Sequence, residues 1–151
     1  MTSEKRRPRV AVDAMGGDIG PAATIPGVVA ALREGGDCEV VLYGDPEAIG
    51  QAVADAGGED LPLHTVSCLE QIGMDESPAA AVRGKPDAPV VRAMRDHREG
   101  AVDAVISAGS TGATVAASLL LLGRVGAAER PAIATFVPTV AGQTLLLDAG
   151  A

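Results

Sequence analysis

Residues 106–124 read ISAGSTGATVAASLLLLGR, and this stretch decides the fold. Its first residues continue the apolar run AVDAVIS, which predicts a strand. A segment of small residues follows, and the wholly apolar run after it predicts a core helix. A plain connection between a strand and a helix needs one glycine and one capping residue, whereas this one has two glycines and three hydroxyls. The excess predicts a loop that holds an anion, with phosphate as the first choice.

This loop offers several kinds of hydrogen-bond donor. Gly109 and Gly112 allow the backbone to approach a ligand closely. The backbone N–H groups of Ser110, Thr111 and Gly112 lie in the first helical turn and have no partner within the helix. The hydroxyls of Ser107, Ser110 and Thr111 add further donors. The competing interpretation is a capped helix that crosses its strand closely. The loop is not a Walker A loop, because no Gly-Lys-Ser/Thr triplet follows.

Outward from this unit, short apolar runs alternate with helical segments. We expect strands at 9–15, 38–44, 61–68, 101–109, 131–138 and 143–150. We expect helices at 21–34, 46–56, 88–99 and 111–124, with the least regular structure at 69–86. This alternation predicts an α/β fold with a doubly wound, mostly parallel sheet and helices on both faces. Residues 1–8 are expected to form a basic tail and residues 9–151 the α/β domain.

Ligands of doubly wound sheets bind beyond the carboxyl ends of the strands. Three glycine-bearing or acidic loops come at such ends, at 15–20, 108–112 and 148–150. If their strands are neighbours, the three loops share one crevice. Asp148 is the candidate binding residue of the third loop.

The loop after the first strand, DAMGGD, supplies candidates of its own. Asp13 lies at the end of the strand, and Asp18 is expected to cap the next helix. Gly16 and Gly17 again permit close approach of the backbone. The motif is weak alone and gains weight beside the loop at 108–112.

The charge balance restricts the partners. With 12 basic and 20 acidic residues the formal charge is −8, which argues against nucleic acid as a partner.

Lys85 lies in the loop RGKPD, from which it could reach a phosphate, although a solvated loop is the competing interpretation. The two histidines are isolated, so neither a metal site nor a cofactor is expected. Two unpaired cysteines and the lack of a 20-residue apolar run indicate a cytoplasmic protein.

Several of these motifs recur together in one family. AVDAMGGD, SAGSTGA, LLLLGR, RPAIAT and LLLDAGA occur in this order over residues 9–151. In this the chain resembles the phosphate acyltransferases of bacterial phospholipid synthesis, known as PlsX. The resemblance implies a fold similar to the phosphotransacetylases and to the isocitrate and isopropylmalate dehydrogenase group.

The resemblance also implies an activity. Family members convert an acyl-carrier-protein thioester and inorganic phosphate to an acyl phosphate, as cytoplasmic homodimers that in places associate peripherally with the membrane. On this basis Lys85 would neutralise the phosphate or the oxyanion, while Asp13 and Asp18 would orient donors. The glycines and hydroxyls of the two loops would hold the phosphate.

An acidic carrier protein needs a basic docking surface on a chain of charge −8. Arg92, Arg95 and Arg98 recur every three residues on the expected helix 88–99, so they share one broad face. This face is the candidate docking surface. The competing interpretation is a solvated helix in which these arginines pair with Asp96 and Glu99.

Three features depart from the family pattern. Ile19 stands where the family usually has His, Ser110 stands where it has Asn, and family members are about twice as long. The chain therefore looks like the N-terminal half of a family member. Three alternatives stay open: a phosphotransacetylase that uses coenzyme A, a dehydrogenase of the related fold, and a non-catalytic fragment or interaction module. The dehydrogenase lacks support, since neither metal-binding aspartates nor a dinucleotide fingerprint is evident.

Overall fold

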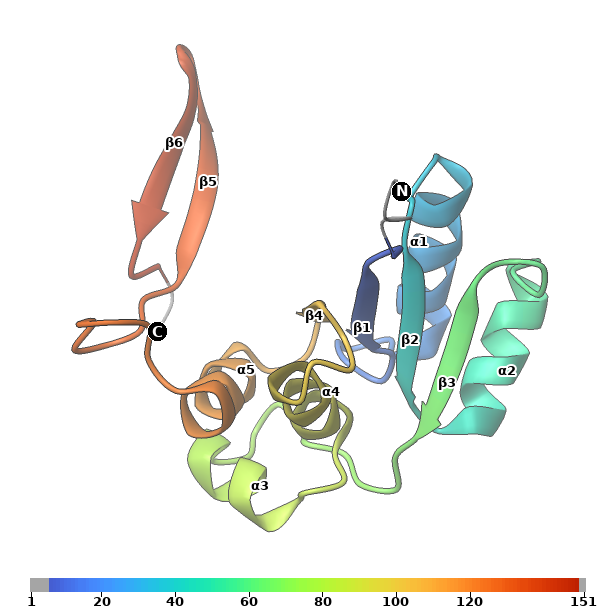
Figure 1. Ribbon diagram of the computed structural model, residues 1–151, viewed down its shortest axis with the longest axis horizontal. Coiled ribbons are helices and arrows are strands. Elements are labelled where there is room, and N and C mark those ends of the chain that lie inside the picture. Colours follow the sequence, from blue (N-terminus) through green and yellow to red (C-terminus); the bar gives the residue numbers. More distant parts are fainter. Residues whose placement is uncertain (1–5, 150–151) are drawn as a thin grey trace, which may run out of the picture.

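Four parallel strands form the central sheet of the computed structural model, which describes residues 6–149. The strands are β1 (Arg9–Asp13), β2 (Glu39–Gly44), β3 (Leu63–Ser67) and β4 (Ala104–Ser107), in the order β3-β2-β1-β4 (Figure 1). The expected α/β fold with a parallel sheet is confirmed. The two central strands, β1 and β2, are short and mostly apolar, as expected for strands covered on both faces.

Helices connect the strands. They are α1 (Pro21–Arg33), α2 (Pro46–Asp55), α3 (Pro78–Gly84), α4 (Pro89–Arg98) and α5 (Thr111–Ala117), which continues into the π-helical η1 (Ser118–Leu122). Each of the helices α1 to α4 begins with a proline, whose fixed φ suits the first turn and whose missing N–H is no loss there. Asp45 caps α2 by accepting a hydrogen bond from the backbone N–H of Glu47 at 2.9 Å.

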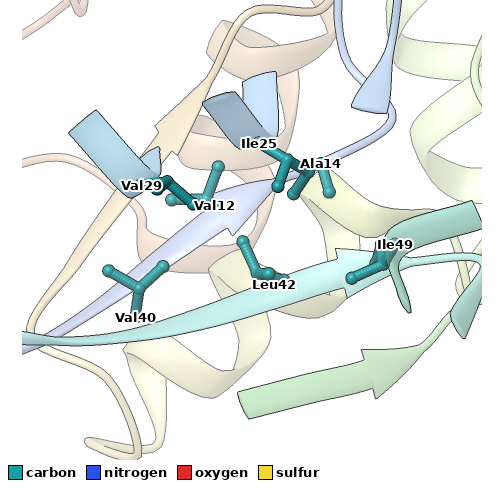
Figure 2. Close-up of a cluster of buried hydrophobic side chains, with 7 residues drawn as sticks. All are labelled: Val12, Ala14, Ile25, Val29, Val40, Leu42 and Ile49. Carbon is teal, nitrogen blue, oxygen red and sulfur yellow. The ribbon is translucent and has the colours of Figure 1, made fainter. Parts of the chain in front are cut away.

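The side chains of β1 and β2 alternate between two apolar layers. Val12 and Leu42 belong to the layer under α1 and α2, which Figure 2 shows in close-up. Ala11 and Val41 belong to the opposite layer, which includes Ala93 of α4. Burial of both layers is the main force that holds the sheet and helices together.

The strand order reverses beside β1. The chain passes through α1 to β2 and through α2 to β3, moving outward on one side of β1. It then returns through α3 and α4 and adds β4 on the other side of β1. The carboxyl ends of β1 and β4 therefore flank a topological switch point, where open α/β sheets bind ligands.

The last two strands do not join this sheet. β5 (Ala134–Thr139) and β6 (Gly142–Leu147) form a separate antiparallel hairpin that stands apart from it (Figure 1). We expected both as strands of the mostly parallel sheet, and this prediction was wrong. The connection between them is too short for a parallel crossover, which needs a dozen or more residues.

Two further expectations need correction or completion. The segment 69–86 contains α3, which the sequence pattern did not indicate. In the expected basic tail, Arg6 and Arg7 form ion pairs with Asp103 and Asp37, while Lys5 lies outside the described residues.

Candidate functional site

Asp13 and Ser107 form the centre of the candidate site. They are register partners at the carboxyl ends of β1 and β4. The Ser107 hydroxyl donates a hydrogen bond to Asp13 Oδ2 at 2.7 Å and accepts one from the backbone N–H of Gly109 at 3.1 Å. The hydroxyl hydrogen that we expected to be free for a ligand is therefore held by Asp13. Ser107 links the strand ends to the loop that follows β4.

The Asp13 carboxyl is buried, with 6% of the residue exposed. Burial raises its pKa above the ordinary value, because desolvation disfavours the charged form. Hydrogen bonds from Ser107 and from the backbone of Met15 and Gly16 act in the opposite direction. Asp13 thus accepts a hydrogen bond from Ser107, and its expected role of orienting donors around a ligand stays a prediction.

Two glycines bring the loops of the site together. A Cβ atom on Gly16 would lie 2.6 Å from the backbone nitrogen of Gly109, closer than real Cβ contacts allow. Gly17 has φ of 83°, a conformation that residues with a side chain rarely adopt. We expected the glycines to admit a ligand. At Gly16 the close approach is between the two loops themselves, so the two loops do share one crevice.

A small cavity lies between these loops and the starts of α4 and α5. Its volume is about 90 Å³, several times the ~10–15 Å³ that a single water needs by this measure. Asp13, Gly16, Gly17, Ser107, Gly109 and Ser110 of the expected residues line it. Polar atoms and two helix N-termini converge on a volume suited to a small oxyanion.

The start of α5 uses the expected residues in different ways. Ser110 caps the helix, accepting a hydrogen bond from the backbone N–H of Ala113 at 3.3 Å. Thr111 is exposed and lies outside the cavity lining. Gly112 faces α3, since a Cβ there would lie 2.7 Å from Pro78 Cγ. Of the three, Ser110 alone lines the cavity.

Lys85 lies behind one wall of the cavity. Its ammonium group donates to the carbonyl of Gln71 at 2.7 Å and to the carboxylate of Glu76. Glu76 also accepts a hydrogen bond from the backbone N–H of Gly73, and the bonds from Lys85 and Gly73 lower its pKa. Gln71 and Gly73 line the cavity, whereas Lys85 does not. The geometry gives Lys85 a bracing contact with the loop 71–76.

Asp18 and Asp148 lie away from this cavity. Asp18 is exposed, and the N-cap of α1 is Gly20, so the prediction that Asp18 caps this helix was wrong. Asp148 follows the hairpin, where its backbone N–H donates to the carbonyl of Ile133 at 2.7 Å. Gly150 of the third loop lies outside the described residues, and Asp148 does not join the crevice, because the strand before it is not a neighbour of β1 or β4.

The arginines of α4 differ in their contacts. Arg92 forms an ion pair with Asp87 at 2.6 Å. Hydrogen bonds from the backbone N–H of Leu69 and from Arg92 lower the pKa of Asp87. Arg95 reaches the carbonyl of Pro86 at 3.5 Å, and Arg98 is exposed. The competing interpretation paired these arginines with Asp96, but Asp96 instead accepts a hydrogen bond from the Tyr43 hydroxyl at 2.6 Å.

Among the cavity residues that sequence reasoning missed are Gln71, Gly73 and Val90. Val90 belongs to the first turn of α4, whose N-cap is Ala88, a residue with no side-chain acceptor. The backbone N–H of Val90 is thus one of the donors that the start of a helix leaves unpaired. The pair Ala88-Pro89 was the available signal, because it predicts a helix that begins without a capping side chain.

The fold and the site together define an α/β protein with a candidate oxyanion site at the switch point of a parallel sheet. A family model described as fatty acid synthesis protein matches residues 8–151, and the chain belongs to this family. It is 50% identical over 143 residues to a phosphate acyltransferase of Desulforudis audaxviator, covering 95% of this chain and 41% of the relative.

Two further relatives agree with this match. A phosphate acyltransferase of Heliobacterium modesticaldum is 49% identical over 95% of this chain and 43% of the relative. One of Desulfitobacterium hafniense is 48% identical, with 95% and 42% covered. The chain therefore spans about two fifths of the length of these curated relatives. Within residues 6–149, the helices are all too short or too polar to cross a membrane.

Proposed function

We propose that this chain forms the phosphate-binding part of an acyltransferase that makes acyl phosphate from an acyl-carrier-protein thioester and inorganic phosphate, in phospholipid synthesis. One observation carries the proposal: the network of Asp13, Ser107 and Gly109 at the switch point, beside two helix starts. The names of the relatives point to the same chemistry, since each is called a phosphate acyltransferase.

The proposed reaction needs positioning more than acid–base chemistry. A phosphate oxygen attacks the thioester carbonyl carbon, the new C–O bond forms, and the C–S bond breaks. The sulfur leaves as thiolate and takes up the proton released by phosphate. The protein has to hold the phosphate in line with the carbonyl and to stabilise the oxyanion that develops there.

The residues of the cavity suit these tasks. We assign the phosphate contacts to the backbone N–H of Val90 at the start of α4 and to the backbone N–H and hydroxyl of Ser110 just before α5. Asp13 and Ser107 fix the loop from which these groups project. Lys85 acts on the site through the loop 71–76, and we assign it a positioning role.

We further propose that the acyl carrier protein docks on the basic side of α4. Arg95 and Arg98 are the residues that remain for an acidic partner, because Arg92 is already paired with Asp87. Charge reversal at Arg98 should weaken the affinity for the carrier protein. It should also make this affinity less dependent on salt concentration, because the attraction between opposite charges that salt screens would be reduced. Unchanged affinity after reversal of both Arg95 and Arg98 would remove this surface from the proposal.

For a protein of the relatives' full length, we further propose a cytoplasmic homodimer that also touches the membrane surface. Exposed apolar side chains on the hairpin support the dimer, because such side chains mark surfaces that other chains cover. Phe136 is 68% exposed and Leu147 is 61% exposed. Analytical ultracentrifugation of a full-length relative tests the dimer.

A second candidate is a phosphate-binding module without turnover. The observation that favours it is the absence of Lys and Arg from the cavity lining among residues 6–149. Acyl phosphate formation by this chain, measured with and without phosphate, separates the two. Phosphate-dependent turnover supports the enzyme, and its absence together with protection by phosphate in a thermal melt supports the module. Equal turnover with carrier-protein and coenzyme A thioesters would indicate a phosphotransacetylase instead.

A further inference from the structure

We propose that an apolar groove beside α1 receives the acyl chain of the substrate. The proposal rests on the function proposed above and adds the place where the hydrocarbon lies. The groove has a volume of about 550 Å³ and runs between α1 and the edge of the sheet formed by β1 and β4. Its location next to the candidate oxyanion site is the first argument.

The groove and the oxyanion cavity are neighbours that share part of one wall. Asp13, Gly16 and Gly17 line both. A thioester carbonyl placed beside a phosphate in the cavity would therefore have its chain at the mouth of the groove.

The walls of the groove are apolar and lack bulk. Ala23, Gly27 and Ala31 come at intervals of four on one face of α1, and Val28 and Ile106 complete the walls. A Cβ atom on Gly27 would meet nothing within 4 Å, and Ile106 is 56% exposed. Along α1 the lining extends from Gly20 to Ala31, about 16 Å at 1.5 Å per residue. The groove is therefore long enough along α1 to hold an extended hydrocarbon chain.

The polar groups along the groove are already paired or lie at its mouth. The Thr24 hydroxyl donates to the carbonyl of Ala14 at 2.8 Å, with the carbonyl of Gly20 also in range. The carboxylate of Asp13 is bonded to Ser107. Asp18 is exposed at the end near the loops. A ligand in the groove would find few partners for hydrogen bonds, which favours hydrocarbon over a polar occupant.

The test compares two alkyl phosphates that share one head group. Ethyl phosphate has the head group alone, while octyl phosphate, used below its micelle concentration, adds a chain. We expect octyl phosphate to bind this chain at least about tenfold more tightly in calorimetric titrations, a gain that fewer than two fully buried methylenes would supply. Equal affinities for the two probes would overturn the groove proposal.

A matched pair of variants locates the chain. Gly27→Leu fills the groove, and Gly50→Leu makes the same change on α2, where a Cβ also meets nothing within 4 Å. Both replace a helical glycine by a better helix former, so both should fold, as circular dichroism would verify. We expect Gly27→Leu to lose the tenfold advantage of octyl phosphate and to keep the affinity for ethyl phosphate. Gly50→Leu should change neither.

The outcomes separate this proposal from the one it rests on. Failure of ethyl phosphate and of inorganic phosphate to bind contradicts the proposed function. Binding of both with no advantage for octyl phosphate contradicts the groove alone. An advantage that survives Gly27→Leu places the chain elsewhere and overturns the assignment. Dissociation of a dimer by Gly27→Leu, with octyl affinity unchanged, would mean that a second copy covers the groove.

Discussion

At the scale of single residues, the site depends on contacts between two loops more than on free ligand-binding groups. The Ser107 hydroxyl donates a hydrogen bond to the Asp13 carboxylate. Gly16 has no side chain, which permits the backbone of Gly109 to approach its Cα closely. The sequence indicated six of the residues that line the cavity, because glycines and hydroxyls after strands are typical of anion sites, but Asp18, Lys85, Thr111, Gly112 and Asp148 lie outside its lining. It could not assign their contacts, since these depend on which strands are neighbours.

Replacement of Gly16 by Ala tests the loop contact. The added Cβ would overlap the backbone nitrogen of Gly109, so we expect the free energy of unfolding to fall by about 1–3 kcal/mol. Gly50→Ala is the control, because its Cβ meets no neighbour, and it should raise the free energy of unfolding by roughly 0.5–1 kcal/mol. Urea denaturation measures both. An unchanged stability in Gly16→Ala would contradict the close approach of the loops.

Replacement of Asp13 by Asn tests the buried carboxyl through its pH dependence. Because burial raises the pKa of Asp13 above 3.8 in the folded protein, the folded state holds this proton more tightly than the unfolded chain. The stability that Asp13 contributes is thus full below pH 3.8 and is lost as pH rises through the raised pKa. Relative to wild type, Asp13→Asn should become more stable from acid to neutral pH. A difference that stays constant, or falls, in denaturation series at several pH values would be inconsistent with this.

At the scale of helices and strands, local signals predicted the elements of the sheet and missed two features. The starts of α1 and α2 were recognisable from Pro21 and from Asp45-Pro46. α3 was missed because 69–86 carries charges and turn residues, although Ser77-Pro78 is a valid helix start. The hairpin was mistaken for strands of the sheet, because its turn contains no Asn-Gly or Asp-Gly pair to mark it.

The loop 71–76 offers a prediction at this scale. If Lys85 braces the loop through Glu76, Lys85→Met and Glu76→Gln should both weaken phosphate binding several-fold, because each releases the same wall of the cavity. Titration of inorganic phosphate measures both affinities. A different pattern, in which Lys85→Met binds phosphate more weakly and Glu76→Gln binds it more tightly than the unaltered chain, would contradict the bracing role. It would mean that the ammonium group of Lys85, once released from Glu76, binds phosphate directly.

At the scale of the whole molecule, the described chain has a packed sheet and an uncovered hairpin. Every residue of β5 and β6 is exposed, and a two-stranded hairpin alone is at best marginally stable in water. In contrast to the hairpin, the core under α1 and α2 is shielded from solvent, with Leu42 and Ile25 fully buried. The stability of the chain is therefore concentrated in the sheet.

Hydrogen exchange should reveal this contrast. Amides of Phe136 and Leu145 in the hairpin should exchange at nearly the rate of an unstructured chain, while those of Val41 and Leu42 are protected up to global unfolding. Mass spectrometry of exchanged peptides would resolve the two regions. Strong protection of the hairpin would show that it packs against another copy in solution.

The most direct test of the oxyanion site is a titration of the isotope-labelled chain with inorganic phosphate, followed by backbone amide resonances. The account predicts saturable shifts at Gly17, Gly109, Ser110 and Val90, which surround the cavity at the carboxyl ends of β1 and β4. Chloride at equal ionic strength should leave these amides unmoved. Saturable shifts confined to other parts of the chain, such as the basic residues Arg6 and Arg7, or no shifts at all, would contradict the account.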